Sequence, residues 1–302
     1  RLRPEALAVK VGEHSIQDVC QMSIVRALKW FQDLDFQGYQ EQIAVPLLRE
    51  LTHRLEFLVN VGLDYLSLGR TMSTLSGGEA QRIRLAGQLG SGLVGVTYVL
   101  DEPSIGLHPR DNARLIQSLK DLQGRGNTVL VVEHDEPTIR SADYVLELGP
   151  GSGALGGEVV FAGSVQRLLQ AADSLTGKYL RRDLVIPMPE SRRRQAQSLR
   201  LEHVRTNNLQ DLSLDMPLGA LVCVTGVSGS GKSSLVVDTM YKHLALARGI
   251  KVDNPGQVDS FQGAEKVEKI ISIDQSPIGR TPRSNPATYT KIFDEIRKVF
   301  AA

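Results

Sequence analysis

The sequence has few of the residues that mark secreted, membrane-bound or metal-binding proteins. Its 302 residues include two cysteines, Cys20 and Cys223, which are far apart in the chain. Such a pair provides neither a disulfide framework nor the closely spaced cysteines of a zinc site. No stretch reaches the roughly 18 consecutive apolar positions of a membrane-spanning helix, and no signal peptide opens the chain. These absences favour a cytoplasmic protein in a reducing compartment, without membrane contact.

The sequence also lacks net charge. The 35 lysines and arginines against 34 aspartates and glutamates leave a formal charge of +1. This balance excludes a histone-like basic protein and an acidic tail, but it allows a local basic face. Hydrophobic residues make up 41% and charged residues 23% of the chain, as in a globular protein with a sizeable core. The length is that of about two ordinary domains.

Residues 1–74 have the periodicity of helices. Ser15 and Asp18 lie at the spacing of a helix start, with a hydroxyl at the cap and a carboxylate in the first turn. Apolar residues then recur at helical spacing from Val19 to Phe31. A second helix is predicted over about residues 45–59, and its buried side would carry Leu47, Leu48, Leu51, Leu55 and Leu58. We expect both stripes to pack in a core.

Short β-branched runs alternate with helical patterns over residues 75–165. The runs are Val96–Leu100, Thr128–Val132, Tyr144–Leu148 and, after a glycine-rich turn, Glu158–Phe161. Strands separated by helices are typical of a parallel α/β sheet.

The remaining residues divide into a linker and a second α/β unit. Residues 166–200 are rich in arginine and proline, and we predict a linker there. Arginine clusters of this kind are more often solvated than bound to nucleic acid. The second unit covers residues 201–302. In it, a strand over Leu221–Thr225 is predicted to lead into a glycine-rich loop and then a helix.

The strongest motif is this glycine-rich loop, whose residues 226–233 read Gly-Val-Ser-Gly-Ser-Gly-Lys-Ser. It matches the P-loop pattern GxxxxGK[ST] at every fixed position. Glycines let backbone N–H groups surround phosphate oxygens, while Lys232 reaches the β- and γ-phosphates and the Ser233 hydroxyl ligates Mg²⁺. The alternative is a glycine-rich turn that binds nothing. The expected nucleotide-binding residues are Gly226, Ser228, Gly229, Ser230, Gly231, Lys232, Ser233 and Ser234.

A second glycine cluster lies at Leu75–Glu79, which reads Leu-Ser-Gly-Gly-Glu. Ser76 and Glu79 have the spacing of a capping box, which would account for these two residues by itself. It does not account for Gly77 and Gly78, because consecutive glycines are costly in a first helical turn unless something approaches the backbone. An anion at a helix N-terminus is such a ligand.

Carboxylates and a histidine follow two of the predicted strands. Asp101 and Glu102 end the first strand of this group, where one carboxylate suits a Mg²⁺ ligand and its neighbour suits a base that orients water. His134 follows the next strand. A lone histidine is more often structural than catalytic, but this one is expected beside Asp101 in the sheet.

Together these motifs resemble the ATP-binding cassette family of P-loop ATPases. By resemblance, Asp101 would hold Mg²⁺, Glu102 would be the catalytic carboxylate and His134 would sense the γ-phosphate. Gln275 lies at the end of a predicted strand Ile270–Ile273 and matches the Q-loop glutamine of that family. By resemblance it would be a Mg²⁺ ligand together with Ser233.

The order of the motifs differs from that of a single cassette. The chain runs signature, Walker B, histidine, Walker A and Q-loop, so it is predicted to join the end of one α/β cassette to the start of the next. Residues 1–74 would then be an α-helical segment of the first signature domain, and 75–165 the rest of that cassette. With Arg1 in place of methionine, this order predicts an internal piece of a longer protein.

Five segments resemble the UvrA family of bacterial excinuclease A subunits more closely than transporter cassettes. They are Leu75–Ala86, Tyr98–His108, Val131–Asp135, Val224–Leu235 and Asp274–Tyr289.

The resemblance implies a dimeric, DNA-binding ATPase. Such a protein recognises damaged double-stranded DNA in nucleotide excision repair, loads the partner UvrB and does not itself cut DNA. ATP and Mg²⁺ would be its cofactors, and its zinc modules would lie outside this chain.

The family arrangement places each ATP between the P-loop of one cassette and the signature of the other. Ser76, Gly77 and Gly78 would therefore complete the site built by residues 226–234 and Gln275. Asp101, Glu102 and His134 would serve the other site. The chain alone is expected to bind nucleotide weakly and to hydrolyse it barely, because it holds no complete P-loop and Walker B pair of one cassette.

Three arginines are candidate DNA contacts, namely Arg280, Arg283 and Arg297. Lesion recognition without base readout would rely on such phosphate contacts. The alternative is that they are solvated or cap helices. Two other functions also stay open: a UvrA-like paralogue in drug resistance or DNA protection, and a tandem-cassette ATPase of transport or translation.

Overall fold

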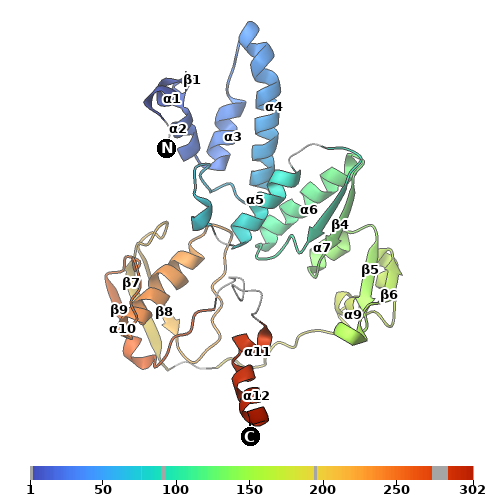
Figure 1. Cartoon of the computed structure of the whole chain (residues 1–302), viewed down its shortest axis with the longest axis vertical. Helices are drawn as coiled ribbons and strands as arrows, with labels where there is room; N and C mark the ends of the chain where they lie inside the picture. The colour runs from blue at the N-terminus through green and yellow to red at the C-terminus, as the bar shows by residue number, and fades with distance from the viewer. Residues whose placement is uncertain (1–2, 76, 90–92, 194–195, 274–284, 302) are drawn as a thin grey trace.

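The computed structural model describes residues 3–75, 77–89, 93–193, 196–273 and 285–301. Figure 1 shows a helical group at one end, an α/β group at its base, a second strand group beside the long helix of the C-terminal half, and a separate C-terminal helix. None of the helices in the described part of the chain has the length and apolarity needed to span a lipid bilayer.

The helical group begins at the predicted helix start. The Ser15 hydroxyl accepts a bond from the Asp18 N–H at 3.3 Å, and the Asp18 carboxylate accepts one from the Ser15 N–H at 2.8 Å. The apolar stripe after it forms two helices instead of one, because the chain turns at Met22 and Ser23 caps the second. The elements are α1 (Pro4–Ala8), β1 (Lys10–Val11), β2 (His14–Ser15), α2 (Ile16–Gln21), α3 (Ile24–Gln32) and α4 (Tyr39–Asn60).

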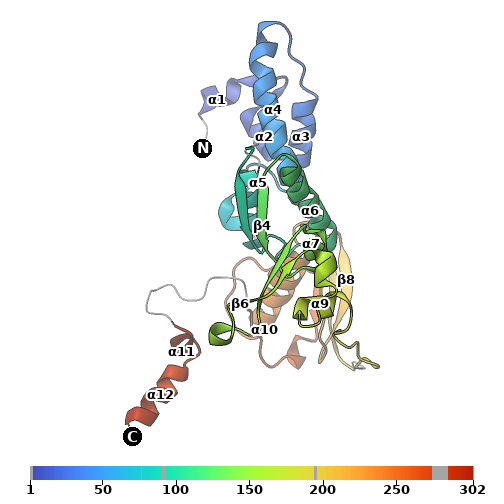
Figure 2. The ribbon, with the colours of Figure 1, turned by 90° about the vertical axis from the view of Figure 1, so that its right-hand side faces the viewer.

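Helix α4 is longer than predicted, and only its C-terminal half is buried. Leu55 is 5% exposed, whereas Leu47 is 60% and Leu51 is 40% exposed, so the predicted burial of these two leucines is wrong. The N-terminal half of α4 projects beyond the other helices in both views (Figures 1 and 2), where little besides α3 packs against it.

The α/β group contains the predicted parallel pair of strands. Strand β3 (Thr97–Asp101) lies parallel to β4 (Thr128–Val132) with Asp101 opposite Val132, and α6 (Pro109–Gly124) forms the crossover. Preceding them are η1 (Met72–Thr74) and α5 (Gly77–Leu89). One core runs through both groups, and it includes Leu55, Phe57, Val61, Leu63, Leu100, Leu115 and Leu122. The main core therefore crosses residue 75, where sequence patterns place a boundary.

The third predicted strand does not extend this sheet. Strand β5 (Val145–Gly149) pairs antiparallel with β6 (Glu158–Gly163), and in the described part of the chain the two form a separate sheet. The expected parallel position of β5 is therefore wrong, because the glycine-rich turn folds β6 back onto it as a hairpin. Helix α7 (Glu136–Ser141) connects β4 to β5.

Part of the predicted linker is ordered as two short helices, α8 (Val165–Leu168) and α9 (Leu175–Leu180). Arg181 donates from Nη1 to the carbonyls of Leu169 and Ala171, at 3.1 Å each. Arg182 pairs with Glu136 of α7 at 3.1 Å. These two arginines therefore connect the helices instead of being only solvated.

The C-terminal half has a three-stranded antiparallel sheet in the order β8-β7-β9. Its core contains Leu199, Leu201, Val204, Leu235, Met240 and Leu244. The elements are β7 (Ser198–Val204), β8 (Leu212–Pro217), a π-helix η3 (Ser234–Tyr241) continuing as α10 (Lys242–Ala247), β9 (Ser260–Gln262), η4 (Ala264–Lys266), α11 (Pro286–Tyr289) and α12 (Ile292–Ala301).

Two predicted strands of this half are not strands in the structure. Residues 221–225 and 270–273 have no regular secondary structure, and Leu221 and Ile273 are 95% and 91% exposed. Their β-branched composition favours extended chain, but a strand also needs hydrogen bonds to a neighbour. No described strand pairs with either segment.

Candidate nucleotide-binding site

The P-loop folds around its own lysine. Lys232 Nζ donates to the carbonyl oxygens of Gly226 and Val227 at 2.7 and 2.8 Å, and the Ser230 N–H donates to the Val227 carbonyl at 3.2 Å. Helical structure begins at Lys232, as predicted, although no strand precedes the loop. A bound phosphate would replace these carbonyls as the partner of the lysine.

Two loop glycines are required by close neighbours. A Cβ atom added at Gly231 would lie 2.7 Å from Leu209, and one added at Gly229 would lie 2.7 Å from the ring of Tyr65. Both residues also have positive φ angles, +99° and +74°, which glycine adopts without strain.

The connection between β7 and β8 lies against the P-loop. Asn208 Nδ2 donates to the Gly229 carbonyl at 2.9 Å, and Asn207 Nδ2 donates to Ser234 Oγ at 3.0 Å. Sequence reasoning missed both asparagines, because an Asn-Asn pair between strands indicates only a turn.

Helix α5 of the N-terminal half also contacts the P-loop. Arg82 is 5% exposed, and its Nη1 donates to Ser228 Oγ at 2.8 Å and to the Val61 carbonyl at 3.3 Å. Its Nε donates to the Gly78 carbonyl at 3.1 Å. The loop therefore meets the Leu-Ser-Gly-Gly-Glu helix within one chain (Figure 1).

Tyr65 packs beside this contact. Its hydroxyl donates to the carboxylate of Glu79. Burial, and next the bond to Glu79, raise the pKa of Tyr65 above its ordinary value. The tyrosine therefore stays protonated and remains a donor to Glu79 across the physiological range.

The start of α5 leaves room for a ligand beside one of its glycines. A Cβ atom added at Gly78 would meet no atom within 4 Å, so no described neighbour requires glycine there. Gly77 begins the helix, while Ser76, and with it the predicted capping box, lies outside the described residues. The approach of an anion to this backbone stays a prediction.

The carboxylate and the histidine after β3 and β4 lie together. Glu102 Oε1 is 3.2 Å from His134 Nε2, and the Glu102 N–H donates to the Val132 carbonyl at 2.9 Å. Glu102 has a φ of +44°, in the left-handed region. Strained backbone of this kind is concentrated at functional sites. Asp101 is exposed at the end of β3.

Two further side chains hold this cluster, and sequence reasoning missed them. Glu133 accepts from the N–H groups of Ser104 and His134 at 2.9 and 3.0 Å. Gln81 Nε2 donates to the Glu102 carbonyl at 3.2 Å. Gln81 and Arg82 are neighbours in α5, so this helix contacts both the carboxylate cluster and the P-loop.

Comparisons with known proteins agree with these motifs. No protein-family model matches the chain. UvrABC system protein A of Thermus thermophilus is 55% identical over 304 residues, and that of Aquifex aeolicus is 54% identical over 304 residues; each match covers 100% of this chain. The structure of UvrA2 from Deinococcus radiodurans has a TM-score of 0.86 and 40% identity over 100% of this chain. The chain is similar to UvrA along its whole length.

The predicted resemblance to UvrA is thereby confirmed. The chain spans about a third of the length of these relatives, 32% and 33% of the two sequences and 38% of the UvrA2 chain. A mixed α/β architecture is shared with UvrA2.

The other predicted site residues of this UvrA-like chain are separate from the clusters above or are not described. Gln275, Arg280 and Arg283 lie outside the described residues. Arg297 lies in α12, with its guanidinium 4.7 Å from the centre of the Phe293 ring.

The described residues provide oxygen donors for Mg²⁺ but no preformed metal cluster. No group of three or more His, Cys, Asp or Glu side chains among them could hold a metal ion. The Ser233 hydroxyl makes no helix-capping bond, and Asp101 is exposed. Each of these oxygens fits Mg²⁺ at its own site, since the ion takes one or two protein oxygens together with phosphate and water.

Proposed function

We propose that this chain is part of a UvrA-type DNA-repair ATPase and that it binds ATP between its P-loop and helix α5. The contact of Arg82 with Ser228 carries this proposal, because it sets the start of α5 beside the loop that would surround the phosphates. The open side of Gly78 supports the same site.

In this site the loop would exchange its internal bonds for bonds to phosphate. Lys232 would release the two carbonyls and pair with the β- and γ-phosphates, and Ser233 would hold Mg²⁺ with Gln275. The amides of residues 228–234 would donate to phosphate oxygens at the positive end of the helix. Ser76, Gly77 and Gly78 would close the site from the other side.

Asp101, Glu102 and His134 would serve a second site, whose P-loop comes from elsewhere. Asp101 would hold Mg²⁺, and Glu102 would orient the attacking water. His134, at 3.2 Å from Glu102, would position that carboxylate and contact the γ-phosphate. In this reading, residues 1–74 and 75–165 belong to one cassette, and residues 201–302 to the next.

We further propose that the complete protein dimerises, binds damaged double-stranded DNA and loads UvrB. Arg280, Arg283 and Arg297 are the candidate phosphate contacts. The similarity to UvrABC system protein A favours a repair subunit over an ATPase of transport or translation.

Binding of a fluorescent ATP analogue to the 302-residue chain tests the nucleotide site. We expect Mg²⁺-dependent binding that Lys232→Ala abolishes. Lys242→Ala is the matched control, because Lys242 pairs with Asp238 at 3.2 Å in the same helical segment and does not contact the loop. Unchanged binding by Lys232→Ala would contradict the site, and rapid ATP hydrolysis by this chain would contradict the division into two sites.

A further inference from the structure

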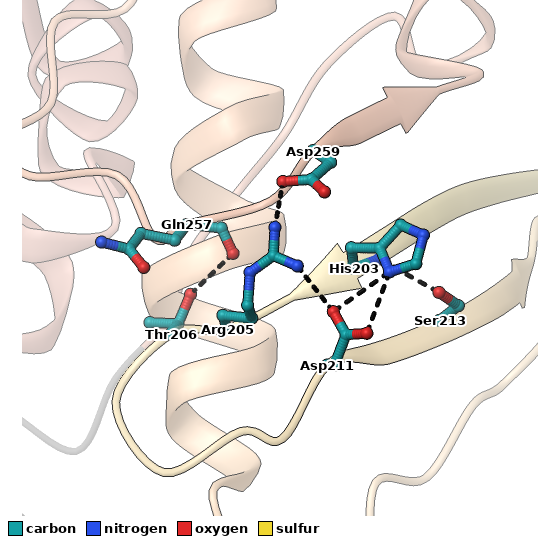
Figure 3. Close-up of polar contacts among 7 residues, drawn as sticks. All are labelled: His203, Arg205, Thr206, Asp211, Ser213, Gln257 and Asp259. Atoms are coloured by element: carbon teal, nitrogen blue, oxygen red, sulfur yellow. Dashed lines mark hydrogen bonds and ion pairs between the residues drawn. The ribbon is translucent and has the colours of Figure 1, made fainter.

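A polar cluster outside the motifs surrounds Arg205, directly after β7 (Figure 3). Arg205 Nη1 donates to Asp211 at 2.7 Å, and its Nη2 donates to Asp259. His203 Nδ1 is 3.0 Å from Asp211 Oδ1, and the His203 N–H donates to Ser213 Oγ at 3.0 Å. The cluster joins the ends of β7 and β8 to the residue preceding β9.

These bonds fix the shape of the connection between β7 and β8, residues 205–211. Arg205 and Asp211 are its first and last residues, so their ion pair closes it. Its backbone is held as well, because the Arg205 N–H donates to the Gln257 carbonyl at 2.9 Å. Asn207 and Asp211 have φ angles of +54° and +52°, and Asn and Asp tolerate this left-handed conformation better than most residues.

The closed connection aims Asn208 at the P-loop. Its Nδ2 donates to the Gly229 carbonyl at 2.9 Å. A trans peptide directs its C=O and N–H in opposite directions. Holding the Gly229 carbonyl at Asn208 therefore turns the Ser230 N–H to the opposite side of the peptide, where it now meets the Val227 carbonyl at 3.2 Å.

We propose that Asn208 is a positioning residue of the nucleotide site and that the ion pairs of Arg205 hold it in place. Asn208 orients the Gly229–Ser230 peptide so that the Ser230 N–H points at the position of a phosphate oxygen. Arg205 acts through the connection and does not touch the nucleotide. This inference rests on the proposed nucleotide site.

Affinity of the 302-residue chain for a fluorescent ATP analogue with Mg²⁺ tests the proposal. Asn208→Ala should weaken binding about fivefold, which corresponds to the loss of one hydrogen bond of about 1 kcal/mol. Asn208→Asp has the same shape but places an acceptor against the Gly229 carbonyl, so it should weaken binding more than Asn208→Ala. A residue that only fills space would give the opposite order.

Two arginine variants test the second step. Arg205→Ala should weaken binding, whereas the matched control Arg200→Ala should not, because Arg200 pairs with Glu202 on β7 at 2.9 Å, away from the loop. The double variant Arg205→Ala with Asn208→Ala should bind no more weakly than Asn208→Ala alone, since both act through one bond.

The outcomes separate this inference from the proposed function. Circular dichroism melting selects variants that keep the fold of the wild-type chain. If the wild-type chain binds, Lys232→Ala does not bind and folded Asn208→Ala and Asn208→Asp bind like wild type, the inference is wrong and the site stands. If the wild-type chain does not bind, both are wrong.

Discussion

Glu102 combines a strained backbone with a position next to His134. A non-glycine residue with φ near +44° costs about 1–3 kcal/mol, and bonds from the Glu102 N–H to Val132 and from Gln81 to the Glu102 carbonyl hold it there. These bonds fix the backbone at Glu102, and the contact with His134 Nε2 at 3.2 Å orients its carboxylate. That precision is what a group orienting a water molecule requires.

Replacement of this carboxylate by an amide should separate hydrolysis from binding. In the complete UvrA-type protein, Glu102→Gln should lower ATP turnover by about 100-fold or more, because an amide cannot accept a proton from water. Retained ATP on the protein would be measured by filter binding. Glu136→Gln is the control, because the Glu136 carboxylate pairs with Arg140 and Arg182 outside the cluster. Unchanged turnover by Glu102→Gln would contradict the assigned role.

Asp211 should give the cluster around Arg205 a dependence on pH. The hydrogen bonds from His203, and next those from Arg205, lower the pKa of Asp211 below its ordinary value. A lowered pKa contributes stability above the unfolded value, about 3.9, and this contribution is lost as the pH falls through the folded value.

We therefore expect Asp211→Asn to lower the melting temperature more at pH 6 than at pH 2.5. Asparagine keeps the left-handed backbone at this position, so the variant removes charge without adding strain. Asp215→Asn on β8 is the matched control. A difference between wild type and Asp211→Asn that is the same at both pH values would show that the charge of Asp211 does not stabilise the fold.

At the scale of elements, helix α5 connects sites that are distant in sequence. Arg82 and Ser228 are 146 residues apart, and Arg82 also bonds the carbonyls of Val61, Gly62 and Gly78. Burying a guanidinium is favourable only if its donors are satisfied. The bonds of Arg82 therefore fix α5, the end of α4 and the P-loop relative to one another.

Arg82→Ala should destabilise the chain by about 3 kcal/mol, because it removes a buried charged donor and leaves carbonyls unpaired. Urea denaturation followed by circular dichroism would measure the change. Arg84→Ala, at an exposed position of the same helix, should stay within about 0.5 kcal/mol of wild type. Equal midpoints for the two variants would mean that the Arg82 bonds contribute nothing to stability.

Local signals predicted the elements that depend on local interactions. The capping box at Ser15, strands β3 and β4, and the helix after the P-loop follow from spacing within a few residues. Residues 221–225 and 270–273 have equally strong β-branched patterns but no described strand beside them, and a sequence pattern does not supply that partner. The same limit applies to the predicted parallel position of β5, which depended on how a distant turn folds.

The candidate site also has residues that local sequence patterns predict and residues that they do not. The P-loop and the proximity of Glu102 to His134 were predictable, because motif spacing and parallel strand order place them. Asn208, Arg82 and Tyr65 were not, since each acts on a residue far away in the chain. Gln275 and Ser76 stay predictions, as they lie outside the described residues.

At the scale of the whole molecule, large apolar side chains are exposed in many of the described segments. The N-terminal half of α4 exposes Leu47, the segment before the P-loop exposes Leu221, and α12 exposes Phe300, which is 88% accessible. Where such side chains cluster into a patch, they mark a surface that binds another protein. The chain spans about a third of the length of these relatives.

We expect the 302-residue chain to self-associate as its concentration rises and its exposed apolar residues to drive this association. Leu221→Ser combined with Ile273→Ser should reduce association in sedimentation velocity runs. Burial of each apolar side chain in a contact would contribute about 1.5–3 kcal/mol of free energy. The melting temperature should stay that of wild type, since both side chains are more than nine-tenths exposed, at 95% and 91%.

Leu63→Ser is the contrasting control: Leu63 is fully buried at 0% exposure, so this change should unfold the N-terminal core. If the double variant associates as strongly as wild type, residues 221–225 and 270–273 are not the contact surface, and α4 or α12 would be tested next.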